Sequence, residues 1–270
     1  MFKSLLTAAG LIAAATAFTP PANPPSSQSF PAPDLAAIKA VDPSTFMTYK
    51  TGNLEREDII SNATIAKRWI CSTSAQFTWG DADNTLGIRI TNGDPNGWRG
   101  FYVYHNSCDR VPYKYIWIEA GKTAFVSLPA LFEGRIIRGE DYLLNGQPQT
   151  LATWFEFSFD KDNIAWGDVS LIRGTDGAVL MWSEDGSGSW KGWDWWILDG
   201  APSNAYRQKS NGIWVIRETE NGDGSINTSA RDYLINKVGT ERVYVDDYHG
   251  NPVISSRNGR FGTHWGPGRP

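Results

Sequence analysis

The chain has 270 residues, a formal net charge of −4 and no long run of Lys or Arg, so the composition does not indicate a nucleic-acid-binding protein. Its 13 Trp, 10 Tyr, 12 Phe and 27 Gly are typical of β structure with many turns. No Gly-rich phosphate loop and no Gly-x-Ser-x-Gly elbow occurs, which argues against nucleotide use and serine-type hydrolysis. We expect no cofactor.

Residues 1–17 have the organisation of a signal peptide. Lys3 precedes an apolar run over residues 5–15, and Ala15-Thr16-Ala17 fits the small-x-small pattern that a signal peptidase accepts. The run is too short to span a bilayer. The sequence therefore predicts a secreted protein with no membrane association, the alternatives being an anchor or an ordinary N-terminal helix.

Residues 18–68 are predicted to be a leader or linker, and the first part of this segment is rich in Pro and Ser. It ends in Lys67-Arg68, the only adjacent pair of basic residues. This pair is a candidate processing site that would remove the leader as a propeptide, and the alternative is an ordinary surface pair.

The chain has two cysteines, Cys71 and Cys108. An even count in an exported protein predicts a disulfide, which would close a loop of about 38 residues and contribute roughly 3–4 kcal/mol in the chain-entropy model. Asn62 and Asn227 each begin a glycosylation sequon, which a secretory route would make usable.

Residues 69–249 are predicted to form an all-β sandwich with Gly-rich loops and little helix. Short segments with alternating or aromatic-rich sequence recur about every ten residues, with Gly and Asn between them. These segments are residues 75–79, 86–90, 101–104, 113–118, 124–128, 151–159, 169–172, 179–182, 213–217 and 242–245. Residues 229–237 are the best helix candidate, and the Gly-, Arg- and Pro-rich tail over 250–270 is expected to be irregular.

Several fragments between residues 90 and 182 follow one another in a familiar order. They are Ile90-Thr-Asn92, Glu119-Ala-Gly121, Ser127-Leu-Pro129, Gly134-Arg-Ile136, Gln149-Thr-Leu-Ala152, Glu156-Phe157 and Asp168-Val-Ser-Leu-Ile172 followed by Gly174. In this order they resemble the thaumatin-like (osmotin-like) proteins, over about a third of the chain. The two cysteines set it apart from the disulfide-rich plant members, so the resemblance is to a divergent fungal-type member.

The resemblance implies a β-sandwich with an acidic cleft that meets glucan polymers. Carried over to this chain, Glu156 and Asp168 match the cleft Glu and Asp of the family. A further family Asp, just before the glycine, is replaced here by Arg173. This exchange of a carboxylate for a cation weakens the case for family-type hydrolysis.

Glycoside hydrolysis requires two carboxyl groups beside the scissile bond, one of them kept protonated by its surroundings. Glu156 and Asp168 are the natural pair, and Asp176 is a substitute for the missing Asp. The alternative is structural: Glu156 lies on the polar face of a strand, and Asp168 caps a turn. Arg173 would weaken a general acid by holding it ionised.

A Trp-rich segment over residues 182–196 is the second candidate site. Trp190, Trp193 and Trp196 offer flat faces for sugar rings, and Asp194 and Arg173 offer polar contacts to hydroxyl groups. The alternative is that these Trp residues fill the core beneath a Gly-rich loop. The three His residues have no ligand spacing, so we expect no metal site.

Three functions remain open from the sequence. The first is a non-catalytic secreted protein that binds polysaccharide or cell-wall glucan, and an interaction with another organism is one use for such binding. The second is a β-glucan hydrolase using Glu156 and Asp168, and the third is a secreted effector that binds a host protein. We expect a monomer in each case.

Overall fold

The structure is a computed structural model, and it describes residues 71–72, 74–106, 108–139, 148 and 150–269. The signal-peptide, leader and processing predictions, with Asn62, Lys67 and Arg68, lie outside these residues. Among the described residues, no helix is long and apolar enough to cross a membrane.

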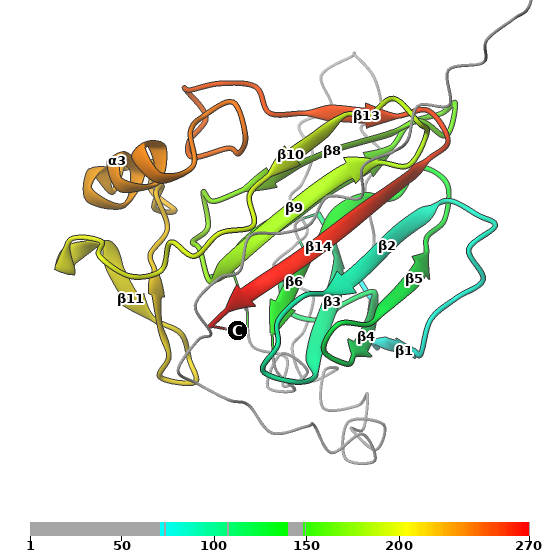
Figure 1. Cartoon of the computed structure of the whole chain (residues 1–270), viewed down its shortest axis with the longest axis horizontal. Helices are drawn as coiled ribbons and strands as arrows, with labels where there is room; N and C mark the ends of the chain where they lie inside the picture. Colours follow the sequence, from blue (N-terminus) through cyan, green and yellow to red (C-terminus); the bar gives the residue numbers. More distant parts are fainter. Residues whose placement is uncertain (1–70, 73, 107, 140–147, 149, 270) are drawn as a thin grey trace, which may run out of the picture.

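Two β-sheets form the body of the protein (Figure 1). The seven-stranded sheet runs in the order β1 (Gln76–Thr78), β4 (Lys114–Ile118), β3 (Arg99–His105), β6 (Glu133–Gly139), β7 (Trp154–Phe159), β8 (Ala165–Ser170) and β13 (Ile254–Ser256). The five-stranded sheet runs in the order β10 (Trp190–Gly192), β9 (Gly177–Ser183), β14 (Arg260–Gly268), β2 (Gly87–Asn92) and β5 (Thr123–Ser127). Neighbouring strands are antiparallel except for β1 with β4 and β14 with β2.

The two sheets bury their facing sides against each other. Phe101 on β3 packs against Trp265 on β14 with ring centroids 5.4 Å apart. Phe155 on β7 packs against Phe261 on β14 at 5.9 Å. One continuous apolar core therefore joins residues from both sheets, and the predicted all-β sandwich is confirmed.

Strand β7 illustrates why this sequence forms a two-faced sheet. Phe155, Phe157 and Phe159 are buried in the core, whereas Trp154, Glu156 and Ser158 alternate with them and are partly exposed. Successive side chains of a strand point to opposite faces. Glu156 is thereby placed on the outer face of the seven-stranded sheet.

A smaller lobe lies beside the sandwich (Figure 1). It contains β11 (Tyr206–Gln208), which pairs with β12 (Trp214–Ile216), a 3-10 turn at Ser203–Ala205, and helix α3 (Thr228–Lys237). The helix agrees with the prediction for residues 229–237, and Ala230 and Leu234 bury its inner face. The predicted strand over 242–245 forms only an isolated bridge between Tyr244 and Ser170.

The expectation of an irregular tail over 250–270 is wrong, and the β domain does not end at residue 249. Strand β14 lies in the middle of the five-stranded sheet between β9 and β2, with Phe261 and Trp265 fully buried. Its glycines indicate close packing rather than irregularity. A Cβ atom on Gly262 would lie 2.2 Å from Cε2 of Trp182, so a larger side chain cannot be accommodated there without displacing the indole.

Candidate functional site

The two predicted carboxylates meet on the outer face of the seven-stranded sheet. Glu156 on β7 and Asp168 on β8 are direct register partners in an antiparallel pair. Side chains in such positions share a face, with Cβ atoms about 4.5–5.5 Å apart. The residues on either side of each acid are buried, so the sheet fixes the spacing of the pair.

The surroundings of the pair disfavour two negative charges. Burial raises the pKa of Asp168 well above its ordinary value, and the neighbouring Glu156 raises it further. Oδ1 of Asp168 is buried and has no hydrogen-bond partner among the described residues. Asp168 is therefore a carboxyl group that favours its protonated form, and one of its oxygens is left without a partner by the fold.

The surroundings of Glu156 act on its pKa in opposite directions. Burial raises its pKa, while a hydrogen bond from Ser170 and the positive charges of Arg135 and Arg173 oppose that rise. The pKa of Glu156 remains above its ordinary value. The pair thus consists of a strongly perturbed Asp and a less perturbed Glu.

Three adjacent cavities form a groove along this face, and they share lining residues. The first, of about 370 Å³, contains Glu156 and Asp168 together with Trp166, Tyr244 and Asp247. The second, of about 610 Å³, shares Glu156 and Asn106 with the first. It is lined by Asn106, Asp109, Arg135, Thr150, Trp154, Glu156 and Arg173.

The third cavity, of about 310 Å³, shares Thr150 and Arg173 with the second. Its lining is rich in basic side chains, namely Arg138, Arg173, Arg207 and Lys209, with Glu218 and Glu220 as the acids. We call the three cavities together the groove. Glu156 and Arg173 mark its two junctions.

Aromatic side chains that the sequence analysis did not select lie in this groove. The side chain of Trp166 is 45% exposed and projects from β8, two residues before Asp168. Trp154 projects from β7, two residues before Glu156. The signal was present in the sequence, because residues two apart on a strand share a face.

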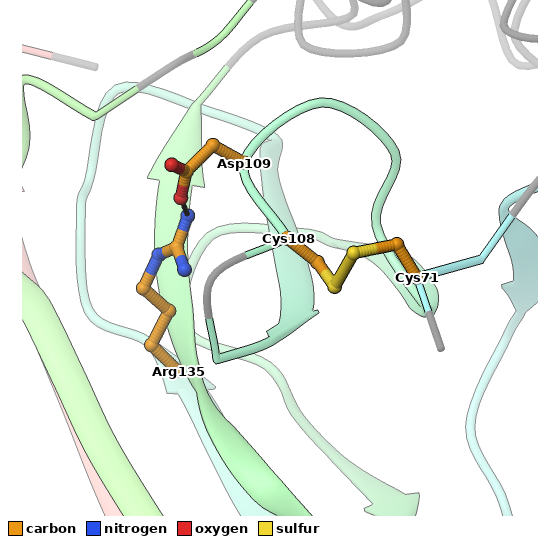
Figure 2. The surroundings of a disulfide bond; sticks show 4 residues. All are labelled: Cys71, Cys108, Asp109 and Arg135. Carbon is orange, nitrogen blue, oxygen red and sulfur yellow. Dashed lines mark hydrogen bonds and ion pairs between the residues drawn. A yellow bond between two sulfur atoms is a disulfide. The ribbon is translucent and has the colours of Figure 1, made fainter. Parts of the chain in front are cut away.

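The wall of the second cavity is braced by the disulfide that the sequence predicted. Cys71 bonds to Cys108, and the next residue, Asp109, pairs with Arg135 (Figure 2). The Arg135 guanidinium lies 4.1 Å above the ring of Trp154 and 4.9 Å above that of Tyr104. The disulfide thus anchors the loop that contains Asp109. Asp109 in turn holds Arg135 over the ring of Trp154.

Arg173 does not neutralise the acid pair by direct contact. It lies in the turn between β8 and β9, is exposed, and makes no ion pair or side-chain hydrogen bond within the described part of the chain. Its charge nevertheless lowers the pKa of Glu156. Arg173 is therefore close to the acids and open to solvent.

Asp176 does not join the pair, contrary to the sequence prediction. It is fully buried, accepts a hydrogen bond from the Thr153 backbone at 3.1 Å and pairs with Lys209 at 2.9 Å. It is not among the residues that line the groove. Asp176 is therefore engaged in contacts within the fold and does not face the groove.

The Trp-rich segment does not form the predicted sugar platform either. Trp193 is fully buried in the core, and Asp194 is almost fully buried. The Arg242 guanidinium lies 4.7 Å above the Trp190 ring, and that of Arg269 lies 5.4 Å above the Trp196 ring. These residues do not line the groove, because they belong to the edge of the other sheet and the loop that follows.

Asn227 is a partly buried residue at the start of α3. Its side-chain amide donates hydrogen bonds to the Glu218 carbonyl at 2.8 Å and to Asn221 Oδ1 at 2.9 Å. A glycan would replace one of the two amide hydrogens of Asn227 and would therefore break one of these hydrogen bonds. Glycosylation at this sequon stays a prediction. Within the described ranges, no group of three or more His, Cys, Asp or Glu side chains is placed to hold a metal ion.

No protein-family model matches the chain, and no curated protein matches it significantly. Among solved structures, it is similar to a laminaripentaose-producing β-1,3-glucanase in complex with laminaritetraose, with a TM-score of 0.36 and 14% identity. The similarity covers 57% of this chain and 55% of that one, so the chain spans about half the length of that protein. The function proposed below therefore depends on the geometry of the groove.

Proposed function

We propose that this protein is a secreted polysaccharide-binding protein and that the polymer lies in the groove. The observation that carries the proposal is the cavity that brings the two carboxyl groups of Glu156 and Asp168 together with exposed Trp166. Indole faces stack on sugar rings, and carboxyl groups bond to their hydroxyls. The succession of three cavities fits an extended chain better than a single small molecule.

Export and a thaumatin-like relationship are part of the same proposal. A disulfide joins the only two cysteines, and such bonds persist in oxidising compartments. Several residues that carry the resemblance also fall on strands, in chain order: Asn92 ends β2, Gly134 lies in β6, and Glu156 and Asp168 lie in β7 and β8. Both observations support the proposal.

Retention on insoluble polymers tests the binding function. The secreted protein is mixed with insoluble glucan, chitin and cellulose, and the bound fraction is measured for the native chain, Trp166→Ala and Trp214→Ala. Trp214 is a matched control, because it is 53% exposed against 45% for Trp166 and does not line the groove.

We expect the native chain and Trp214→Ala to be retained on one of these polymers. Trp166→Ala is expected to bind about tenfold more weakly, since an aromatic contact is worth roughly 0.5–1.5 kcal/mol beyond its buried area. Failure of the native chain to bind any of the polymers would contradict the proposal. So would equal losses in the two Trp variants.

A second candidate function, hydrolysis of the bound polymer, is favoured by the unequal environments of the two carboxyl groups. Protonated Asp168 would donate its proton to the glycosidic oxygen as the bond to the anomeric carbon breaks. Ionised Glu156 would attack this carbon directly, because a spacing of about 5 Å suits a nucleophile, whereas attack through water requires about 6.5–9.5 Å. The leaving sugar gains the Asp168 proton, and the other sugar is held as an ester of Glu156. Water then hydrolyses this ester and gives a proton to Asp168, which restores both carboxyl groups.

Release of reducing ends separates hydrolysis from binding alone. We expect Glu156→Gln and Asp168→Asn each to lower the rate of release by about 100-fold or more, because each removes one of the two carboxyl groups that the reaction requires, while polymer retention persists. Release that is unchanged in Glu156→Gln would remove Glu156 from this role. Retention without any release in the native chain would leave polysaccharide binding as the function.

A further inference from the structure

The groove has a charge gradient along its length. At the acid-pair end, the first cavity contains Glu156, Asp168 and Asp247 and no Lys or Arg. The second cavity contains two acids, Asp109 and Glu156, and two cations, Arg135 and Arg173. At the far end, four basic side chains face two acids.

Most cations of the groove are already engaged by the protein. Lys209 pairs with buried Asp176, and Arg207 pairs with Glu218. Arg138 is buried and donates to the Asp176 and Gly266 carbonyls. Arg135 pairs with Asp109.

Arg173 differs from these four cations. Within the part of the chain that the structure describes, its guanidinium has no ion pair or hydrogen-bond acceptor, and its side chain is exposed at the junction of the second and third cavities. The turn that carries it is closely packed: a Cβ atom on Gly174 would lie 2.6 Å from Leu151 Cδ1. The position of Arg173 is therefore fixed by the backbone, while its donors are available to a ligand.

We propose that the polymer bound in this groove is a mainly neutral polysaccharide with anionic substituents, and that Arg173 is the residue that selects it by binding one such group. Guanidinium groups bind carboxylate or sulfate oxygens through two parallel hydrogen bonds. This inference rests on the proposed function, because it assigns the substrate class of the same groove.

The gradient also sets where the anionic group lies. An anion beside Glu156, Asp168 and Asp247 would be repelled by these acids, whereas one at Arg173 would be attracted. The sugar at the acid pair is therefore uncharged, and the charged unit lies toward the third cavity. A chain with a net charge of −4 does not attract polyanions in general, so selection depends on this local cation.

The test compares three soluble forms of one β-glucan: unmodified, sparsely carboxymethylated and sparsely sulfated. Affinity is measured by titration for the native chain, Arg173→Gln, Arg173→Lys and Arg257→Gln. Arg257 is the control for charge, because it is exposed, its side chain makes no ion pair within the described residues, and it does not line the groove.

We expect the native chain to bind a modified glucan about tenfold more tightly than the unmodified one, as for one hydrogen-bonded ion pair. Arg173→Gln should remove this preference, so that it binds the modified and unmodified glucans with equal affinity. Arg173→Lys should restore part of it, which a merely structural role would not allow. Arg257→Gln should behave as the native chain, and the preference should weaken as salt is raised. The two modified forms tell whether carboxylate or sulfate is preferred.

Equal affinity of the native chain for all three glucans would overturn the inference about Arg173 and leave polysaccharide binding intact. An equal loss of preference in Arg173→Gln and Arg257→Gln would also overturn it, because the effect would then be one of overall charge. Failure to bind any of the three glucans, together with no retention on the insoluble polymers, would instead contradict the proposed function itself.

Discussion

The groove and the Trp-rich segment contain the same types of residue, yet the structure uses them differently. In the groove, exposed Trp166 lies beside Asp168, which has a buried oxygen without a partner. In the Trp-rich segment, Trp193 is buried and the Trp190 face is covered by Arg242. Composition alone therefore does not identify a binding site, because what decides is whether aromatic faces and polar atoms are still unoccupied after folding.

Replacing two residues of the Trp-rich segment, buried Trp193 and exposed Trp190, is expected to give the largest effect. Trp193→Ala is expected to lower the free energy of unfolding by about 3–5 kcal/mol, because it leaves a large cavity in the core. Trp190→Ala is expected to cost about 1 kcal/mol, because its ring is 46% exposed. Urea unfolding measures both, and similar losses would show that the two residues do not differ as core and surface.

Removal of the disulfide tests whether the Cys71–Cys108 bond stabilises the protein and the wall of the groove next to Asp109. The double variant Cys71→Ser with Cys108→Ser is expected to lose roughly 3–4 kcal/mol of unfolding free energy. It should also bind polymer more weakly, since Asp109 follows Cys108 and pairs with Arg135 over Trp154. Polymer affinity that is unchanged in the folded variant would separate the disulfide from the groove.

Much of the sandwich can be predicted from sequence because its signals are local. The alternation of Phe155, Phe157 and Phe159 with polar neighbours assigns β7 and its two faces. Strand β14 was missed, although Phe261, Thr263 and Trp265 alternate in the same way. Its glycines suggested irregular backbone, whereas Gly262 makes room for Trp182, which is 80 residues earlier in the chain.

The site could be predicted only in part for a similar reason. Glu156 and Asp168 were found from their residue types and the family resemblance, and their register confirms that they are adjacent. Asp176 was misplaced because its partner Lys209 comes from β11–β12 loop sequence far along the chain. Tyr244 reaches the groove through a single bridge to Ser170, a contact that leaves no periodic pattern in the sequence.

The smallest expected effect is a gain in folding stability when Asp168 of the groove is replaced by Asn. The pKa of Asp168 is raised in the folded state, mainly by burial and then by Glu156. For such an acid, folding is favoured most below the unfolded pKa, and this contribution is lost as the pH rises through the folded pKa. Asp168→Asn should therefore be more stable than the native chain at neutral pH, by about 1–2 kcal/mol, and the difference should shrink toward pH 4.

Urea unfolding of both proteins at several pH values between 4 and 7 measures this difference. Asp232→Asn is the matched control, because Asp232 is an exposed helix residue paired only with its neighbour Arg231 among the described residues. Its substitution should change stability little across the same range. A constant difference between Asp168→Asn and the native chain would mean that the carboxyl group does not titrate within this window. If the stability advantage of Asp168→Asn grows with pH, the native carboxyl group lowers the stability of the fold. Such a cost is expected of a residue whose role is to contact a ligand.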